Sequence, residues 1–106
     1  MWLGLLAYLM GVLASSTAQS QPAPSPTNGR ALAAKLCAGC HLVGPDAKGP
    51  VPDGVPSFMA IAARPDNDER RIQAALISAP HPLMPSPPLD SRQMADVASY
   101  ILTLRP

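Results

Sequence analysis

The stretch KLCAGCH, residues 35–41, contains both cysteines of the 106-residue chain and one of its two histidines. Cys37 and Cys40 are separated by two residues, and His41 follows directly. Such a cluster is compatible with four kinds of chemistry: a disulfide, a redox-active dithiol, part of a zinc site, or an attachment point for a larger group. The rest of the chain has to decide among them.

The C-x-x-C-H spacing favours the last of these, because it is the attachment signature of c-type haem. Two thiols three residues apart on a helical turn can each add to a vinyl group on one porphyrin edge, and His41 can then direct its imidazole at the iron. Helix-forming residues precede the cysteines, whereas a thioredoxin-like dithiol follows a strand. Adjacent Cys40 and His41 suit tetrahedral zinc poorly, even with His81 as a further ligand. These arguments do not exclude a disulfide between Cys37 and Cys40.

Composition also favours a bulky cofactor. Residues 29–106 form such a small domain that a hydrophobic core alone would give it only marginal stability. Only Phe58 and Tyr100 supply large aromatic rings there, since Trp2 and Tyr8 lie in the apolar amino-terminal segment. The eight basic and seven acidic residues nearly balance and form no basic block, so we expect no nucleic-acid partner.

The amino-terminal segment reads as a targeting sequence. Residues 1–14 are apolar and uncharged, and small residues follow, so residues 1–18 are predicted to be a signal peptide cleaved after Ala18, or alternatively after Ser20. A membrane anchor is the other interpretation, and the protein is expected at a membrane only when this leader is uncleaved. Residues 19–28, QSQPAPSPTN, are predicted to be a Pro/Ser-rich linker or disordered arm.

The pattern in residues 29–106 predicts an all-α domain. Long loops without periodicity cover residues 42–56 and the proline-rich stretch before residue 91. Asp90 and Gln93 form a capping-box pair ahead of the last apolar stripe. Apolar spacing and helix-start residues place the expected helices at residues 29–36, 57–63, 67–78 and 91–104.

Four motifs now carry a family resemblance: CAGCH, PSFMAIA at residues 56–62, HPLMP at residues 81–85, and MADVASYILTLRP at residues 94–106. Together they resemble the small single-haem class I c-type cytochromes of bacterial periplasms over nearly all of residues 29–106. The resemblance implies the class I cytochrome c fold, with three to four helices and long loops packed around one covalently attached haem. It also implies a periplasmic protein that carries electrons and is not an enzyme.

The resemblance further implies a second axial ligand of the iron. Family members use a methionine in the loop before the last helix, where this chain has Met84. Thioether ligation favours ferrous iron and raises the reduction potential. His81, three residues earlier, is the main competitor, whereas Met59 and Met94 are expected to pack in the core.

The same resemblance also implies residues that support the haem and its ligands. A proline carbonyl usually accepts a hydrogen bond from the ligand histidine, a role that falls to Pro56 with Pro50 as the alternative. The first and last helices should cross with Gly29 against Tyr100, and Ala33 stands where many relatives carry an aromatic residue. The haem propionates could pair with any of four basic residues, with surface charge as the default: Lys48, Arg64, Arg70 and Arg71.

With His41 and Met84 on the iron, no substrate reaches it, and the expected function is one-electron transfer between redox partner proteins by a monomer. Docking is expected at the exposed haem edge near Cys37 and Cys40. One alternative is a haem protein whose Met84 is displaced in small-ligand binding or peroxidase-type chemistry. Another is a dedicated cytochrome subunit of a dehydrogenase complex.

Overall fold

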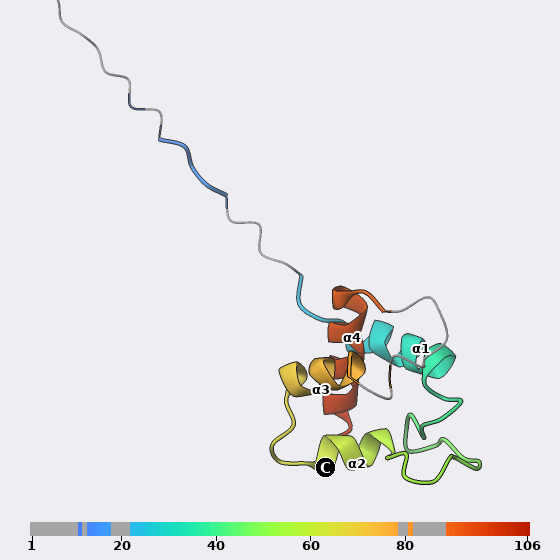
Figure 1. Ribbon diagram of the computed structural model, residues 1–106. Helices are drawn as coiled ribbons and strands as arrows, with labels where there is room; N and C mark the ends of the chain where they lie inside the picture. Colours follow the sequence, from blue (N-terminus) through green and yellow to red (C-terminus); the bar gives the residue numbers. More distant parts are fainter. Residues whose placement is uncertain (1–10, 12, 18–21, 79–80, 82–88) are drawn as a thin grey trace, which may run out of the picture.

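The computed structural model describes residue 11 and residues 13–17, 22–78, 81 and 89–106. These residues form four α-helices and no strand, in agreement with the all-α prediction. Most of the predicted signal peptide lies outside the described residues. Among the described residues, no helix is both long and apolar enough to cross a membrane. The helices, coloured along the chain in Figure 1, are α1 (Pro26–Leu36), α2 (Phe58–Ala63), α3 (Glu69–Leu76) and α4 (Ser91–Thr103).

Each helix begins where a short polar side chain can bond the exposed backbone N–H groups of the first turn. The caps are Ser25, Ser57, Asp68 and Asp90, and each accepts a hydrogen bond from the backbone N–H three residues later. In α4 the Gln93 side chain also bonds the Asp90 backbone, which confirms the expected capping box.

Two helices, α1 and α3, differ from their expected bounds by more than one residue. The first helix begins at Pro26 and not at Gly29, so residues 26–28, assigned to the linker, are helical. Ser25 provides the cap, and proline suits the first helical position because its missing N–H has no helical partner there. The third helix is shorter than residues 67–78, because Asp68 caps it and Leu76 ends it.

The helices α1 and α4 cross in close contact at Gly29. A Cβ atom at Gly29 would overlap the backbone carbonyl of Asp96 and lie 2.9 Å from the Cβ of Tyr100. Gly29 and Tyr100 are therefore partners at the crossing, as expected. Ala33, one turn further along α1, is completely buried, so a small side chain suits this close contact.

A buried carboxylate fastens the same crossing. Asp96 on α4 is 2% exposed and accepts hydrogen bonds from the Ser25 backbone N–H and the Asn28 side chain, both at 2.7 Å. These two bonds, with a smaller attraction from Arg92, hold the pKa of Asp96 below its ordinary value despite burial. The ionised carboxylate thus ties the start of α1 to the middle of α4.

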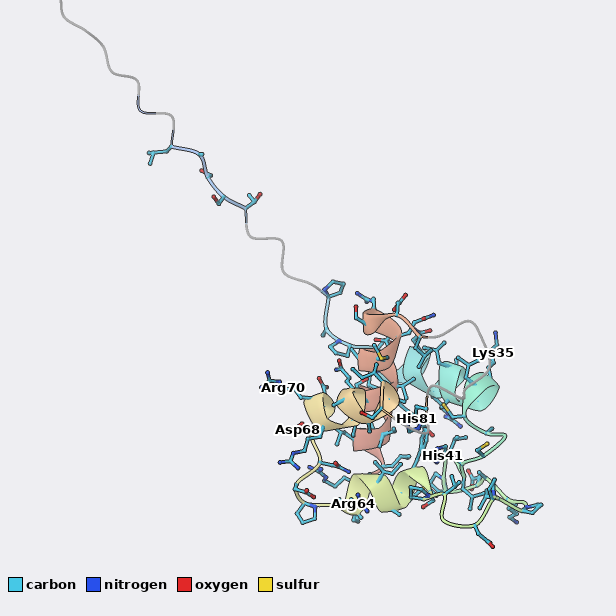
Figure 2. All side chains as sticks on the ribbon, in the orientation of Figure 1. Lys35, His41, Arg64, Asp68, Arg70 and His81 are labelled. Atoms are coloured by element: carbon cyan, nitrogen blue, oxygen red, sulfur yellow. The ribbon has the colours of Figure 1, made fainter. Side chains whose placement is uncertain are left out.

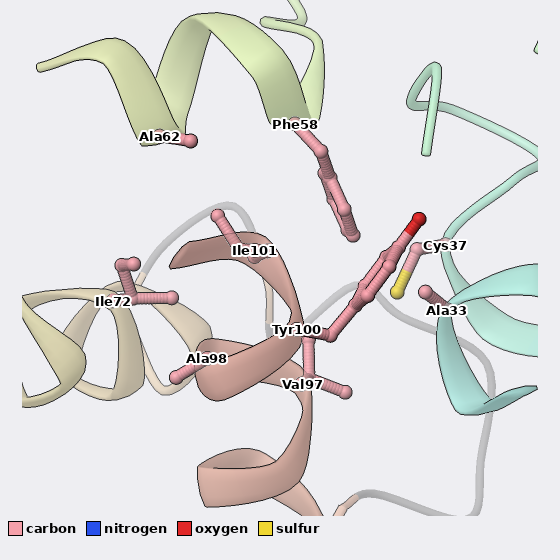
Figure 3. Close-up of a cluster of buried hydrophobic side chains, with 9 residues drawn as sticks. All are labelled: Ala33, Cys37, Phe58, Ala62, Ile72, Val97, Ala98, Tyr100 and Ile101. Carbon is pink, nitrogen blue, oxygen red and sulfur yellow. The ribbon is translucent and has the colours of Figure 1, made fainter. Parts of the chain in front are cut away.

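Most side chains of the core are small. Figure 3 shows the buried cluster, in which Phe58 and Tyr100 are the large aromatic residues. Of the nine buried hydrophobic residues in the described part of the chain, five are alanine, cysteine or valine. Since a domain of this size has little apolar area to bury, the protein side chains alone make a weak core.

The carboxyl end of the chain is fixed to the turn between α2 and α3. The Arg105 guanidinium donates hydrogen bonds to the carbonyls of Ala62, at 2.9 Å, and Asn67, at 2.7 Å. Asn67 in turn donates from its side chain to the Ile61 carbonyl at 2.8 Å. This network holds α2, which carries the segment next to the candidate site, in a fixed position relative to α4.

Candidate haem site

The cysteines lie in the turn that ends α1. Cys37 is the last residue bonded into the helix, through its N–H and the Ala33 carbonyl at 2.9 Å. The Cys37 carbonyl then accepts from the backbone N–H groups of Cys40, at 3.1 Å, and His41, at 2.9 Å. These bonds close a tight turn at the carboxyl end of α1, which contains all three residues of the C-x-x-C-H motif.

Both thiols are unpaired, so Cys37 and Cys40 do not form the disulfide considered from the sequence. Cys37 is 7% exposed and lies beside Ala33 and Tyr100 in Figure 3, whereas Cys40 is exposed. Burial raises the pKa of Cys37 to about 11, so its thiol stays protonated near neutral pH. A redox dithiol or a thiolate ligand of zinc needs the opposite shift.

The His41 ring is fixed by a backbone carbonyl. Its Nδ1 lies 2.6 Å from the Pro56 carbonyl oxygen, which is therefore the partner and not the alternative, Pro50. Because a carbonyl can only accept, Nδ1 is the donor, and Nε2 is the ring nitrogen left for a metal ion. This is the arrangement that orients a metal-binding imidazole. Phe58 packs against the ring with centroids 5.4 Å apart.

Two other helices hold the segment that follows His41. The Phe58 N–H at the start of α2 donates to the Leu42 carbonyl at 2.9 Å. The Tyr100 hydroxyl on α4 donates to the Val43 carbonyl at 2.6 Å. Tyr100 and Phe58 also contact each other, with ring centroids 6.3 Å apart. The position of His41 therefore depends on α1, α2 and α4 together.

The structure describes three of the four other candidate ligands. Met84 lies outside the described residues. His81 is described and lies close to His41, with ring centroids 6.2 Å apart (Figure 2). Met59 packs against the core, as expected, and Met94 is half-buried on α4.

None of the four basic residues considered for the propionates is singled out. Arg71 forms an exposed ion pair with Asp66 at 3.2 Å. Lys48, Arg64 and Arg70 are exposed. Such positions agree with solvated surface charge.

Sequence reasoning missed Asp96, although a signal for it exists. Tyr100 was expected to face α1, and a residue four positions earlier lies on the same face of a helix. Asp96 occupies that position, so a carboxylate had to meet the start of the first helix. Asn28 and the Ser25 backbone supply the hydrogen bonds that this burial requires.

An all-α domain with two unpaired cysteines and an oriented histidine in a C-x-x-C-H turn defines a c-type haem protein. The donor set suits that group: Cys37 and Cys40 are available for thioether bonds, and His41 presents a free Nε2. The chain belongs to the cytochrome c family, whose model matches residues 26–105. It is 36% identical over 106 residues to cytochrome c-552 of Bradyrhizobium diazoefficiens, covering 100% of both chains. No solved structure matches the chain.

Family membership confirms four expectations from the sequence. The protein has the cytochrome c fold, binds haem c with its iron covalently through cysteine, and transfers electrons rather than acting as an enzyme. As an electron carrier it interacts with redox partner proteins. The chain has two cysteines, Cys37 and Cys40, for the covalent attachment.

Proposed function

We propose that the protein is a periplasmic one-electron carrier whose haem is attached through Cys37 and Cys40 and ligated by His41 and Met84. The observation that carries the proposal is the 2.6 Å hydrogen bond from His41 Nδ1 to the Pro56 carbonyl, which leaves Nε2 available and the ring unable to turn freely. Pro56 is the positioning residue of this pair.

The chain supports electron transfer by holding the cofactor and controlling access to it. Haem c, when bound, supplies an Fe(II)/Fe(III) couple. His41 and Met84 would together hold the iron, which would exclude small molecules and leave electron transfer through the ring edge. Cys37 is buried and Cys40 exposed, which favours an exposed haem edge on the Cys40 side. Brief docking of donor and acceptor proteins needs only a small interface there.

The periplasmic location is supported by the apolar and uncharged residues 1–14, followed by small residues, as in a signal peptide. Export also agrees with covalent haem attachment at two unpaired cysteines. The intact mass of the holoprotein from the periplasmic fraction decides between cleavage after Ala18, cleavage after Ser20 and retention of the leader. Sedimentation of the same sample tests the expected monomer.

A redox titration of the purified holoprotein, followed by absorbance, tests the function and its ligands together. We expect a reversible one-electron curve, a potential raised by thioether ligation, and the weak near-infrared sulfur-to-iron band in the oxidised protein. Met84→Ala should abolish that band. Met94→Ala, which removes a half-buried methionine from α4, is the matched control and should retain it. A wild-type spectrum without the band excludes Met84 as the ligand.

Carbon monoxide distinguishes the carrier from the alternative in which Met84 is displaced by a small molecule. The reduced carrier should show no change in its haem spectrum with carbon monoxide at neutral pH, because both axial positions are occupied. Rapid and complete binding would instead support the ligand-binding or peroxidase-type function.

A further inference from the structure

His81 is held at the end of α3 by its own hydrogen bonds. Its backbone N–H donates to the Ser78 carbonyl at 2.8 Å, and its ring Nδ1 lies 2.6 Å from the Ala75 carbonyl oxygen. The Ser78 hydroxyl also donates to the Ala74 carbonyl at 2.8 Å, which fixes Ser78 against α3. The ring is therefore oriented by α3.

In His81, as in His41, Nδ1 faces a backbone carbonyl and Nε2 does not take part in that hydrogen bond. The Ala75 carbonyl can only accept, so Nδ1 of His81 is the donor and Nε2 is the ring nitrogen left for a metal ion. A histidine whose other nitrogen donates to a backbone carbonyl has the usual arrangement of a metal ligand. Among the described residues, both histidines of the chain show this arrangement.

The two rings also have a mutual geometry that suits one shared metal ion. Their planes differ by 9° and their centroids are 6.2 Å apart, too far for contact between stacked rings. Imidazole–metal bonds of about 2.0–2.1 Å place two rings on one metal ion with centroids about 6 Å apart. Figure 2 shows His81 and His41 near each other, beside α3 and between α1 and α2.

We propose that His81 is an alternative axial ligand, whose Nε2 binds the haem iron opposite His41 when Met84 is released. The inference rests on the proposed function, because it needs a haem ligated by His41. His81 and Met84 are three residues apart and compete for one axial position. The exchange breaks an iron–sulfur bond and forms an iron–nitrogen bond, without transfer of an electron. Ligation by His81 lowers the reduction potential, because the thioether that favours ferrous iron is lost.

Met84→Ala in the holoprotein tests the inference. We expect the oxidised variant to remain low-spin, with the electron paramagnetic resonance and absorbance spectra of two imidazole ligands and a lower potential than wild type. Adding His81→Ala should convert it to a high-spin haem. A second imidazole ligand can come only from His81, because the chain has two histidines and His41 is the first ligand.

A matched control excludes a lysine amine as the ligand. The chain has two lysines, and Met84→Ala combined with Lys35→Ala or Lys48→Ala should stay low-spin. A high-spin Met84→Ala variant, or a low-spin one that is unchanged by His81→Ala, overturns the inference.

A different experimental result would contradict the proposed function. A holoprotein that does not titrate as a reversible one-electron couple contradicts the carrier itself, whatever the variants show. A wild-type near-infrared band together with a high-spin Met84→Ala variant keeps the His41–Met84 carrier and removes His81.

Discussion

Asp96 shows how one side chain sets the stability of this domain. It is the buried acid on α4 that bonds the Ser25 backbone and the Asn28 side chain at the start of α1. Removing a hydrogen-bonded charge from a buried position leaves its donors without partners. The sequence signals this burial only through Tyr100, one turn later on the same face of α4, because the burial of Asp96 depends on which face of α4 meets α1.

Asp96→Asn should lower the free energy of unfolding at pH 7 by about 1–3 kcal/mol. Folding depresses the pKa of Asp96, so its contribution is present above the unfolded pKa, about 3.9, and is lost as pH falls through the lower folded value. Denaturant unfolding of the holoproteins at pH 7 and pH 3 should therefore show a difference between wild type and variant that shrinks at low pH.

Asp53→Asn is the control, because Asp53 is an exposed acid in the loop before α2. It should change the unfolding free energy by less than about 0.5 kcal/mol at either pH. A constant difference between Asp96→Asn and wild type across this range contradicts the assigned role of the charge.

At the scale of elements, the helices were largely predictable because their starts are local. Ser57, Asp68 and Asp90 are short polar residues directly before the helices that they cap. The start of α1 at Pro26 was missed because three prolines in residues 19–28 indicated a linker, although proline is also favourable at a first helical position.

The α1–α4 crossing gives an element-scale prediction. Gly29→Ala should destabilise the holoprotein by about 1–3 kcal/mol, because the added Cβ overlaps the Asp96 carbonyl and crowds Tyr100. This cost has to exceed the gain of about 0.5–1 kcal/mol that alanine brings to a helix relative to glycine. Thermal unfolding measures the balance as a lower Tm.

Ala31→Leu is the matched control in the same helix. Ala31 is exposed, so a larger side chain there should change stability by no more than about 0.5 kcal/mol. A Gly29→Ala variant with an unchanged or higher Tm would show that α1 and α4 can separate at no cost.

At the scale of the whole molecule, the C-x-x-C-H turn was predictable because its residues are adjacent, and the carbonyl that fixes His41 followed from the family resemblance. The contacts that support the turn could not be predicted from the sequence. Tyr100 bonds the Val43 carbonyl, and Arg105 bonds the carbonyls of Ala62 and Asn67. A backbone acceptor has no sequence signature, and these partners meet only when the complete fold brings them together.

The small core predicts that the fold depends on its cofactor. A Cys37→Ala, Cys40→Ala double variant isolated without haem should lose its cooperative unfolding transition, because most buried hydrophobic side chains in the described part of the chain are small. Far-ultraviolet circular dichroism during heating measures this. Cys40→Ala, which keeps the buried thiol of Cys37 for one thioether bond, should retain a cooperative transition. A sharp transition in the haem-free double variant would mean that the protein core suffices.

The hydrogen bond between Ser25 and Asp96 also constrains when the chain can fold. Its partners are 71 residues apart, so the start of α1 lacks this partner until α4 has been synthesised. A domain whose helices α1 and α4 must meet cannot complete its core before α4 has left the ribosome. The newly made domain therefore stays open until then, a delay that suits the export and later haem attachment that we propose.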